Sequence, residues 1–272
     1  MKKLASLIAA SAMFAGSAIA SPMYMDLSSL ITPSGAWGSQ TAAFDRFNLN
    51  TFSPVSTYFS ETGVVQTGDL VTDSASGIVT NLSGAGTLMD SAGYGLDWNL
   101  QLSWELSGVA VVSTDANNNT IYQGIFNSGN VIFTINELSG AVPTGNSWDV
   151  LNLSVFGSGF INNGVGIQIN SEISSVAQGV FFTTYNNRDF FDYFTSGDFF
   201  LAIGQADISN LNNAPVCSQN QNADGFFECS RTTTVGTASI FTQVPEPTSV
   251  AILGAGLLGM GFAARRRRNK AA

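Results

Sequence analysis

The sequence contains no histidine, and no lysine occurs between Lys3 and Lys270. The absence of histidine excludes a Ser-His-Asp triad, a Cys-His pair and any zinc site that uses imidazole ligands. The absence of lysine from the central part of the chain excludes a Ser-Lys dyad and a Schiff base there. No P-loop or dinucleotide-binding fingerprint follows a predicted strand. For catalysis, this leaves carboxylate pairs of the kind that glycosidases use.

The glutamates available for such a pair are not distinguished by their spacing. They are Glu105, Glu137, Glu172 and Glu228, and nothing in the sequence singles out two of them. Carboxylates are ordinary residues of the solvated face of a β protein. We therefore expect that the protein is not an enzyme and that it needs no cofactor.

Basic residues are scarce in the body of the chain. All nineteen acidic residues lie between Asp26 and Glu246, whereas Arg46, Arg188 and Arg231 are the only basic residues of that span, which gives it a formal charge of −16. A surface this acidic does not neutralise phosphates, so we expect no nucleic-acid partner. It repels anionic surfaces and attracts divalent cations or basic partners.

The body of the chain shows the period-two alternation of β-strands. Between Leu96 and Leu106, even-numbered positions are apolar and odd-numbered positions are polar, which predicts a strand with one buried face. The same pattern recurs at Val131 to Ile135, at Leu151 to Val155 and at Val165 to Ile169. Turn-forming clusters between such segments include 115–119, 128–130, 144–146 and 162–164. Some ten short strands predict an all-β fold, a single β-sandwich or jelly-roll-like domain. The aromatic-rich segment 188–200 is expected to cap one end of it, with an exposed aromatic patch as the alternative.

The first twenty residues are typical of a secretory signal peptide. Met1-Lys2-Lys3 is a positively charged start, Leu4 to Gly16 is apolar or small, and Ala18-Ile19-Ala20 is an A-x-A cleavage site. Cleavage before Ser21 by signal peptidase is therefore expected. The export machinery and signal peptidase are the first partners that the sequence predicts.

The only two cysteines are Cys217 and Cys229, twelve positions apart. In an exported protein such a pair predicts a disulfide. On the chain-entropy account, closing a loop of this size stabilises the fold by about 3 kcal/mol. A redox or metal-binding pair lacks both the C-x-x-C spacing and neighbouring ligands.

The segment between the cysteines has the pattern of the first half of an EF-hand calcium loop. Asn220, Asn222 and Asp224 are its candidate ligands, followed by Gly225. Position one is Asn instead of Asp, and Arg231 stands where a bidentate Glu is needed. Asn and Asp in turns also satisfy neighbouring backbone groups, which is the ordinary explanation. Calcium remains an alternative here, and we base no function on it.

The C-terminal region combines a short motif, an apolar run and a basic cluster. Val244, Pro245, Glu246 and Pro247 precede seventeen uncharged residues from Thr248 to Ala264. As a helix these span about 25 Å, close to the hydrocarbon thickness of about 30 Å. Arg265, Arg266, Arg267 and Arg268 follow at once. Because basic clusters stay on the cytoplasmic side, the body of the chain is expected outside.

These three parts in this order resemble the PEP-CTERM sorting signal of Gram-negative bacterial surface proteins. The resemblance implies an exosortase, a membrane-embedded cysteine transpeptidase-like enzyme, that recognises Pro245 to Pro247 and cuts nearby. It also implies a cell-surface or extracellular-matrix protein associated with exopolysaccharide, biofilm or floc formation. We therefore divide the chain into a signal peptide (1–20), a β-sandwich ectodomain (21–243) and a sorting signal (244–272).

Two alternatives remain open. The C-terminal region is also compatible with a plain single-span anchor that happens to contain Pro-Glu-Pro. The body is also compatible with a carbohydrate-binding module tethered at the cell surface, in which Tyr185, Tyr193 or Trp148 would stack on sugar rings beside Asn and Asp hydrogen-bonding groups. Several aromatic side chains along one exposed face would favour the second alternative.

Overall fold

A computed structural model describes residues 22–31, 39–49, 52–83, 92–161, 166–184, 186–197, 201–209 and 213–243. Strands dominate these residues, so the prediction of an all-β body is confirmed. In chain order the elements are β1 (Met23–Met25), β2 (Arg46–Leu49), β3 (Val55–Ser60), β4 (Leu70–Ser83), β5 (Trp98–Thr114), β6 (Thr120–Ser139), β7 (Val142–Ile161), β8 (Gly166–Val176), β9 (Phe181–Thr183), α2 (Phe190–Ser196), β10 (Leu201–Ser209), β11 (Val216–Cys217), β12 (Phe227–Thr232) and β13 (Thr234–Gln243).

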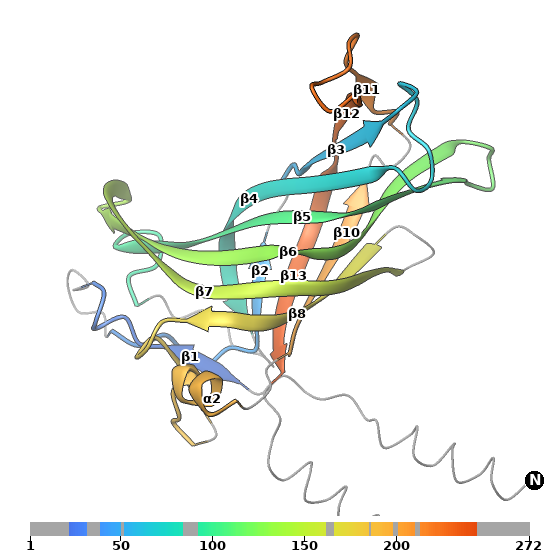
Figure 1. Ribbon diagram of the computed structural model, residues 1–272. Helices are drawn as coiled ribbons and strands as arrows, with labels where there is room; N and C mark the ends of the chain where they lie inside the picture. Colours follow the sequence, from blue (N-terminus) through green and yellow to red (C-terminus); the bar gives the residue numbers. More distant parts are fainter. Residues whose placement is uncertain are drawn as a thin grey trace, which may run out of the picture.

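The large sheet is antiparallel and closes on itself. Its strand order is β11-β12-β3-β4-β2-β13-β10-β8-β7-β6-β5, and β5 also pairs with β4. This last pairing makes a ring of β4, β2, β13, β10, β8, β7, β6 and β5. Figure 1 shows β4 to β7 running across one side of the molecule, with β2, β13 and β10 crossing behind them. The core lies between these two sides of the ring.

This topology differs from the predicted sandwich or jelly roll. A sandwich has two separate sheets, whereas here hydrogen bonds run from strand to strand around the ring. The alternation of buried and exposed side chains is the same in both arrangements, because each strand has one inward and one outward face. The sequence pattern therefore predicts the strands and their buried faces without distinguishing two sheets from one closed sheet.

The predicted buried faces are found at their positions. Leu100 and Leu102 of β5, Phe133 and Ile135 of β6, and Leu153 of β7 are all at most 1% exposed. Leu96, the first residue of the strand predicted up to Leu106, instead lies before β5 and is 50% exposed. Alternation thus identified the core strands, and the boundary shifted by two residues.

Two predicted turns are wrong, because they lie inside long strands. The clusters 128–130 and 144–146 fall within β6 and β7, which are 20 residues long each. Gly129 explains the first: its φ is 140°, and a Cβ there would lie 2.3 Å from the carbonyl oxygen of Glu105 on β5. Glycine in a strand marks a bulge or a close backbone approach as readily as a turn. The cluster 115–119 does form the hairpin turn between β5 and β6.

One end of the ring is closed by β1, β9 and α2, which lie together in Figure 1. Phe47 of the ring contacts Phe181 of β9 at 6.3 Å between ring centroids, and Phe181 contacts Phe190 of α2 at 5.9 Å. Asp189 caps α2 by accepting from the Phe191 N–H, and it also accepts from the Gly179 N–H. The described part of the aromatic-rich segment is therefore a cap, as predicted, although its short helix was not expected.

Within the described residues, no helix has both the length and the apolar character needed to cross a membrane. The predicted membrane helix, 248–264, lies outside these residues.

Candidate functional site

Several of the predicted site residues lie outside the described residues. These are the signal-peptide cleavage residues Ala18, Ala20 and Ser21, the motif Val244, Pro245, Glu246 and Pro247, and the basic cluster Arg265 to Arg268. The last described residue, Gln243, ends β13, which is hydrogen-bonded to β10 on one side and to β2 on the other. The predicted sorting signal therefore begins directly after a strand of the ring.

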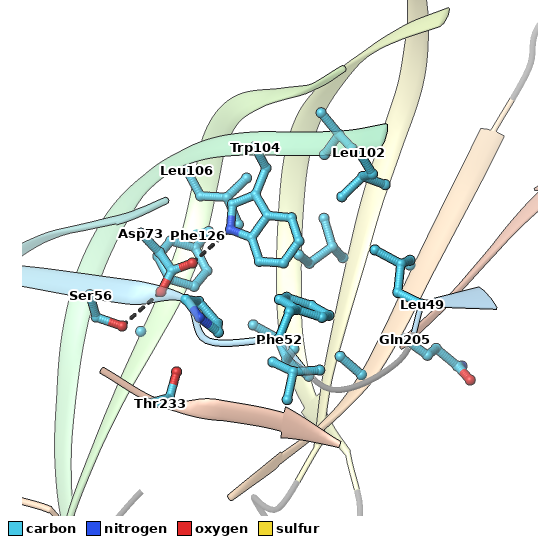
Figure 2. A pocket seen from close by; sticks show the side chains of 18 of the residues that line it. Leu49, Phe52, Ser56, Asp73, Leu102, Trp104, Leu106, Phe126, Gln205 and Thr233 are labelled. Atoms are coloured by element: carbon cyan, nitrogen blue, oxygen red, sulfur yellow. Dashed lines mark hydrogen bonds between the residues drawn. The ribbon is translucent and has the colours of Figure 1, made fainter. Parts of the chain in front are cut away.

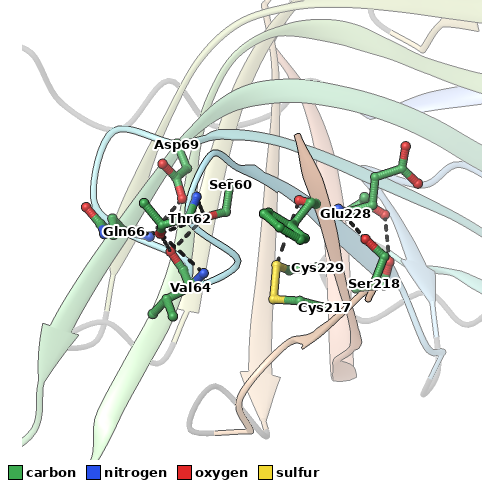
Figure 3. The surroundings of a disulfide bond; sticks show 12 residues. Ser60, Thr62, Val64, Gln66, Asp69, Cys217, Ser218, Glu228 and Cys229 are labelled. Atoms are coloured by element: carbon green, nitrogen blue, oxygen red, sulfur yellow. Dashed lines mark hydrogen bonds between the residues drawn. A yellow bond between two sulfur atoms is a disulfide. The ribbon is translucent and has the colours of Figure 1, made fainter. Parts of the chain in front are cut away.

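The predicted disulfide between Cys217 and Cys229 is confirmed. The two residues are directly opposite each other on β11 and β12, and their sulfur atoms are 2.05 Å apart. Figure 3 shows the bond beside the turn that follows β3. Cys229 is fully buried, so the disulfide fixes the small β11–β12 hairpin to the core.

The calcium candidates form a turn held by its own hydrogen bonds. The Asn222 side-chain oxygen accepts from the backbone N–H groups of Asp224 and Phe226, both at 3.0 Å. Its amide nitrogen donates to Glu228 at 3.0 Å, while the Asn220 carbonyl accepts from the Ser218 hydroxyl. Among the described residues, no group of three acidic or cysteine side chains is placed to hold a metal ion. Calcium binding at Asn220, Asn222 and Asp224 stays a prediction.

The aromatic residues considered for sugar stacking do not share an exposed face. Tyr193 is only 6% exposed, and the Arg188 guanidinium lies 3.9 Å from its ring centroid. Trp148 is half-buried and packs against the core, and Tyr185 lies outside the described residues. The Tyr193 ring is therefore not available to a sugar.

A cavity of about 100 Å³ lies inside the ring, away from the end closed by α2. Figure 2 shows that its side chains come from strands of both sides of the ring. Most of its lining is apolar and includes Leu49, Phe52, Leu102, Trp104, Leu106, Phe126, Leu153, Ile167, Ile169 and Ile240. Sequence analysis did not predict this cavity.

Polar side chains gather at one end of the cavity. Asp73 of β4 accepts two hydrogen bonds of 2.7 Å, one from the Trp104 indole N–H and one from the Ser56 hydroxyl, as the dashed lines in Figure 2 show. Burial raises the pKa of the Asp73 carboxyl above 3.8, while these two hydrogen bonds and the charge of Arg231 act in the opposite direction. The carboxylate is therefore held by donors in a site that disfavours its charge.

Arg231 supplies the positive charge of this polar end. It lies on β12 directly opposite Ser56 of β3, which in turn lies directly opposite Asp73 of β4. Its guanidinium donates to the Tyr58 hydroxyl at 2.8 Å and to the Tyr122 carbonyl at 2.5 Å. Burial lowers the pKa of Arg231, and the neighbouring Tyr58 and Asp73 raise it. A buried cation thus faces a buried carboxylate across one strand.

The C-terminal region matches a known protein-sorting motif. The PEP-CTERM protein-sorting motif matches residues 243–268. The chain carries a PEP-CTERM motif. The motif implies an exported protein that is sorted to the cell surface and processed by an exosortase. No curated protein and no solved structure matches the chain.

The match to the PEP-CTERM motif begins at Gln243, the last residue of β13. The body and the motif therefore follow each other in sequence without an intervening linker. The cavity and its polar end belong to the body, because all of their lining residues lie between Leu49 and Ile240.

One signal in the sequence could have located Arg231. Phe227, Cys229 and Arg231 alternate with Glu228, Ser230 and Thr232, so Arg231 falls on the inward face of a strand. The sequence pattern predicts a strand from Thr232 to Phe241, which leaves Arg231 just outside it. An arginine on an apolar strand face predicts a buried partner, because an unpaired buried charge is costly.

The burial of Asp73 predicts a pH dependence of stability. Because its pKa is raised in the folded protein, the stability contributed by Asp73 is fully present below its ordinary value of 3.8 and is lost as the pH rises through the folded-state pKa. The Asp73→Asn variant lacks this titration. We expect wild-type stability to fall relative to Asp73→Asn as the pH rises above 3.8, measured by urea unfolding at a series of pH values.

Asp115 provides the control for this pH series. Hydrogen bonds from the Asn119 side chain and backbone lower its pKa below 3.8 in an exposed turn. Its contribution is present above 3.8 and is lost as the pH falls through the lowered value. The difference between wild type and Asp115→Asn should stay constant over the same pH range, and an equally constant difference for Asp73→Asn would refute the prediction.

Proposed function

We propose that the protein is a non-enzymatic component of the cell surface or extracellular matrix of a Gram-negative bacterium, associated with exopolysaccharide in biofilm or floc formation. The observation that carries the proposal is the PEP-CTERM motif at 243–268, directly after the last strand of a folded all-β body. The strongly acidic body supports a role outside the cell among polymers rather than on nucleic acid.

The proposed route has three steps. Signal peptidase removes residues 1–20 during export, and the apolar run 248–264 then holds the chain in the inner membrane with Arg265 to Arg268 on the cytoplasmic side. An exosortase cuts near Pro245 to Pro247 and delivers the body to the surface. The body keeps its fold during delivery through the ring of strands and the Cys217–Cys229 disulfide.

A non-enzymatic role without a cofactor agrees with the polar groups of the body. The chain has no histidine, and the buried pair Asp73 and Arg231 is held by hydrogen bonds to Ser56, Trp104 and Tyr58. Glu137 and Glu228 each accept from an asparagine side chain. The alternative of a tethered carbohydrate-binding module has less support, because the Tyr193 ring is covered by Arg188.

The mature C-terminus tests the sorting step. Intact mass should show that protein recovered from the cell surface and medium lacks everything beyond about Pro247. The Glu246→Ala variant should keep its C-terminal residues and stay in the membrane fraction, whereas the matched Glu228→Ala variant, which changes an exposed glutamate of the body, should be processed like wild type. A surface form that still contains Arg265 to Ala272 would mean a plain anchor and would refute sorting.

A deletion strain tests the association with matrix. Without the gene, the cells should form less biofilm or floc and retain less exopolysaccharide. Wild type should restore both, and Glu246→Ala should restore neither. Normal biofilm, floc and exopolysaccharide in the deletion strain would overturn this part of the proposal while leaving the sorting result intact.

A further inference from the structure

We propose that the cavity inside the ring is a binding site for a small neutral molecule, mainly apolar and carrying one hydroxyl group, such as a small phenol or alcohol. The cavity volume of about 100 Å³ suits a molecule of this size. A mainly apolar cavity with a few convergent polar groups is the usual form of a small-molecule site. A closed sheet of eight strands has an interior of the right width to hold one small ligand.

The apolar part of the ligand is selected by the walls. Phe52 and Trp104 pack edge to face with ring centroids 5.0 Å apart, and Leu102 and Leu153 are each 1% exposed. The cavity is partly open, and Phe52, Trp104 and Ile169 of its lining are half-buried, so we expect a ligand to enter without unfolding of the sheet.

The hydroxyl of the ligand is selected at the polar end. Thr233 lines the cavity together with Ser56 and Asp73, and it is 4% exposed. Figure 2 shows its oxygen on the side that faces Ser56 and Asp73. A ligand hydroxyl placed beside Thr233 and Ser56 can exchange hydrogen bonds with polar side chains that already line the cavity. Because Asp73 and Arg231 offset each other, a neutral ligand fits better than an ion.

The cavity owes its space to a glycine that the backbone does not require. Gly204 of β10 lies directly opposite Ile240 of β13 and Ile169 of β8, and all three line the cavity. A Cβ at Gly204 would be 3.8 Å from both isoleucines, an ordinary van der Waals distance. Gly108 differs, since a Cβ there would lie 1.9 Å from the Ile125 carbonyl oxygen. A strand glycine with room for a side chain is typical of a place where a ligand approaches.

Gly204→Leu is therefore the variant that fills the cavity. Its matched control is Gly157→Leu on β7, where a Cβ would have no neighbour within 4 Å. Gly157 lies opposite Asn170, one residue along β8 from the cavity-lining Ile169, and so belongs to the outer face of the sheet. Both variants place the same side chain in a strand, and only one of them occupies the cavity.

The test is a ¹⁹F NMR titration of 4-fluorophenol with the full chain in lipid nanodiscs, with empty nanodiscs as the baseline. Wild type and Gly157→Leu should bind the probe, and Gly204→Leu should not. 4-Fluorotoluene, which lacks the hydroxyl, should bind wild type about fivefold more weakly, and 4-fluorobenzoate should not bind. Thr233→Val should bind 4-fluorophenol and 4-fluorotoluene equally.

Each contrary result counts against the site. If wild type gives no response above empty nanodiscs, or if Gly204→Leu responds like wild type, the cavity does not bind this class of molecule. If Thr233→Val retains the preference for 4-fluorophenol, the assigned position of the hydroxyl is wrong. The Thr233→Val result also keeps the test decisive should Gly204→Leu fail to fold.

Discussion

Replacing Arg231 with methionine is expected to lower the free energy of unfolding by about 3–5 kcal/mol. Methionine keeps an apolar stem of similar length and removes the charge and the donors. The Tyr58 hydroxyl and the Tyr122 carbonyl then lose their hydrogen bonds from the guanidinium. The larger cost arises because Asp73, 8% exposed, is left as a buried carboxylate without its cation. Urea unfolding at neutral pH measures the change.

Two further variants show how much of this loss comes from the unpaired carboxylate of Asp73. Arg46→Met removes a cation that pairs with Asp45 at 3.0 Å at a partly exposed site, and it should cost less than about 1 kcal/mol. The double variant Arg231→Met with Asp73→Asn should be more stable than Arg231→Met alone, because the stranded charge is gone. If Arg231→Met lost no more stability than Arg46→Met, the buried charges at the polar end of the cavity would not contribute to the stability of the fold.

Phe133→Ala is expected to be as damaging, at about 3–5 kcal/mol, for an unrelated reason. Phe133 is fully buried, and its ring lies 4.7 Å from that of Phe47, which contacts the cap through Phe181. The deletion leaves a cavity where the two sides of the ring meet the cap, and the closed sheet cannot collapse around it without breaking strand pairs. Thermal and urea unfolding should both report the loss.

Phe156→Ala is the matched control for this variant. Phe156 lies on β7 and is 52% exposed, so removing its ring should change stability by no more than about 0.5 kcal/mol. If the two variants were equally stable, the core would not be centred on Phe133, and the account of how the cap is attached to the ring would be wrong.

The sequence alone predicts the strands far better than it predicts their connections. Alternation at 98–106, 131–135 and 151–155 is a local property, and the structure places those buried faces as expected. Whether Gly129 makes a turn or a bulge depends on its partner strand β5, so the local pattern wrongly predicts a turn in the middle of β6. The choice between a sandwich and a closed ring depends on the single β4–β5 pairing, which no local pattern records.

The candidate sites also differ in how well the sequence predicts them. The PEP-CTERM motif and the pair Cys217 and Cys229 are readable because their spacing in sequence is their signature. The polar end of the cavity joins Asp73, Ser56 and Arg231 from three strands, and only the register of the sheet brings them together. The cavity itself depends on the side chain that is missing at Gly204, and a missing side chain gives no pattern to recognise.

The position of β13 also sets the order of events during export. An exported chain crosses the membrane from its N-terminus, so β2 emerges long before β13, its neighbour in the ring. Until residue 243 has crossed, β2 and β10 each present an open edge that can pair with another chain. The next residue to emerge belongs to the PEP-CTERM motif. The ring can therefore close only when the chain is present up to the start of the PEP-CTERM motif, and a chain that ends earlier keeps the open edges of β2 and β10.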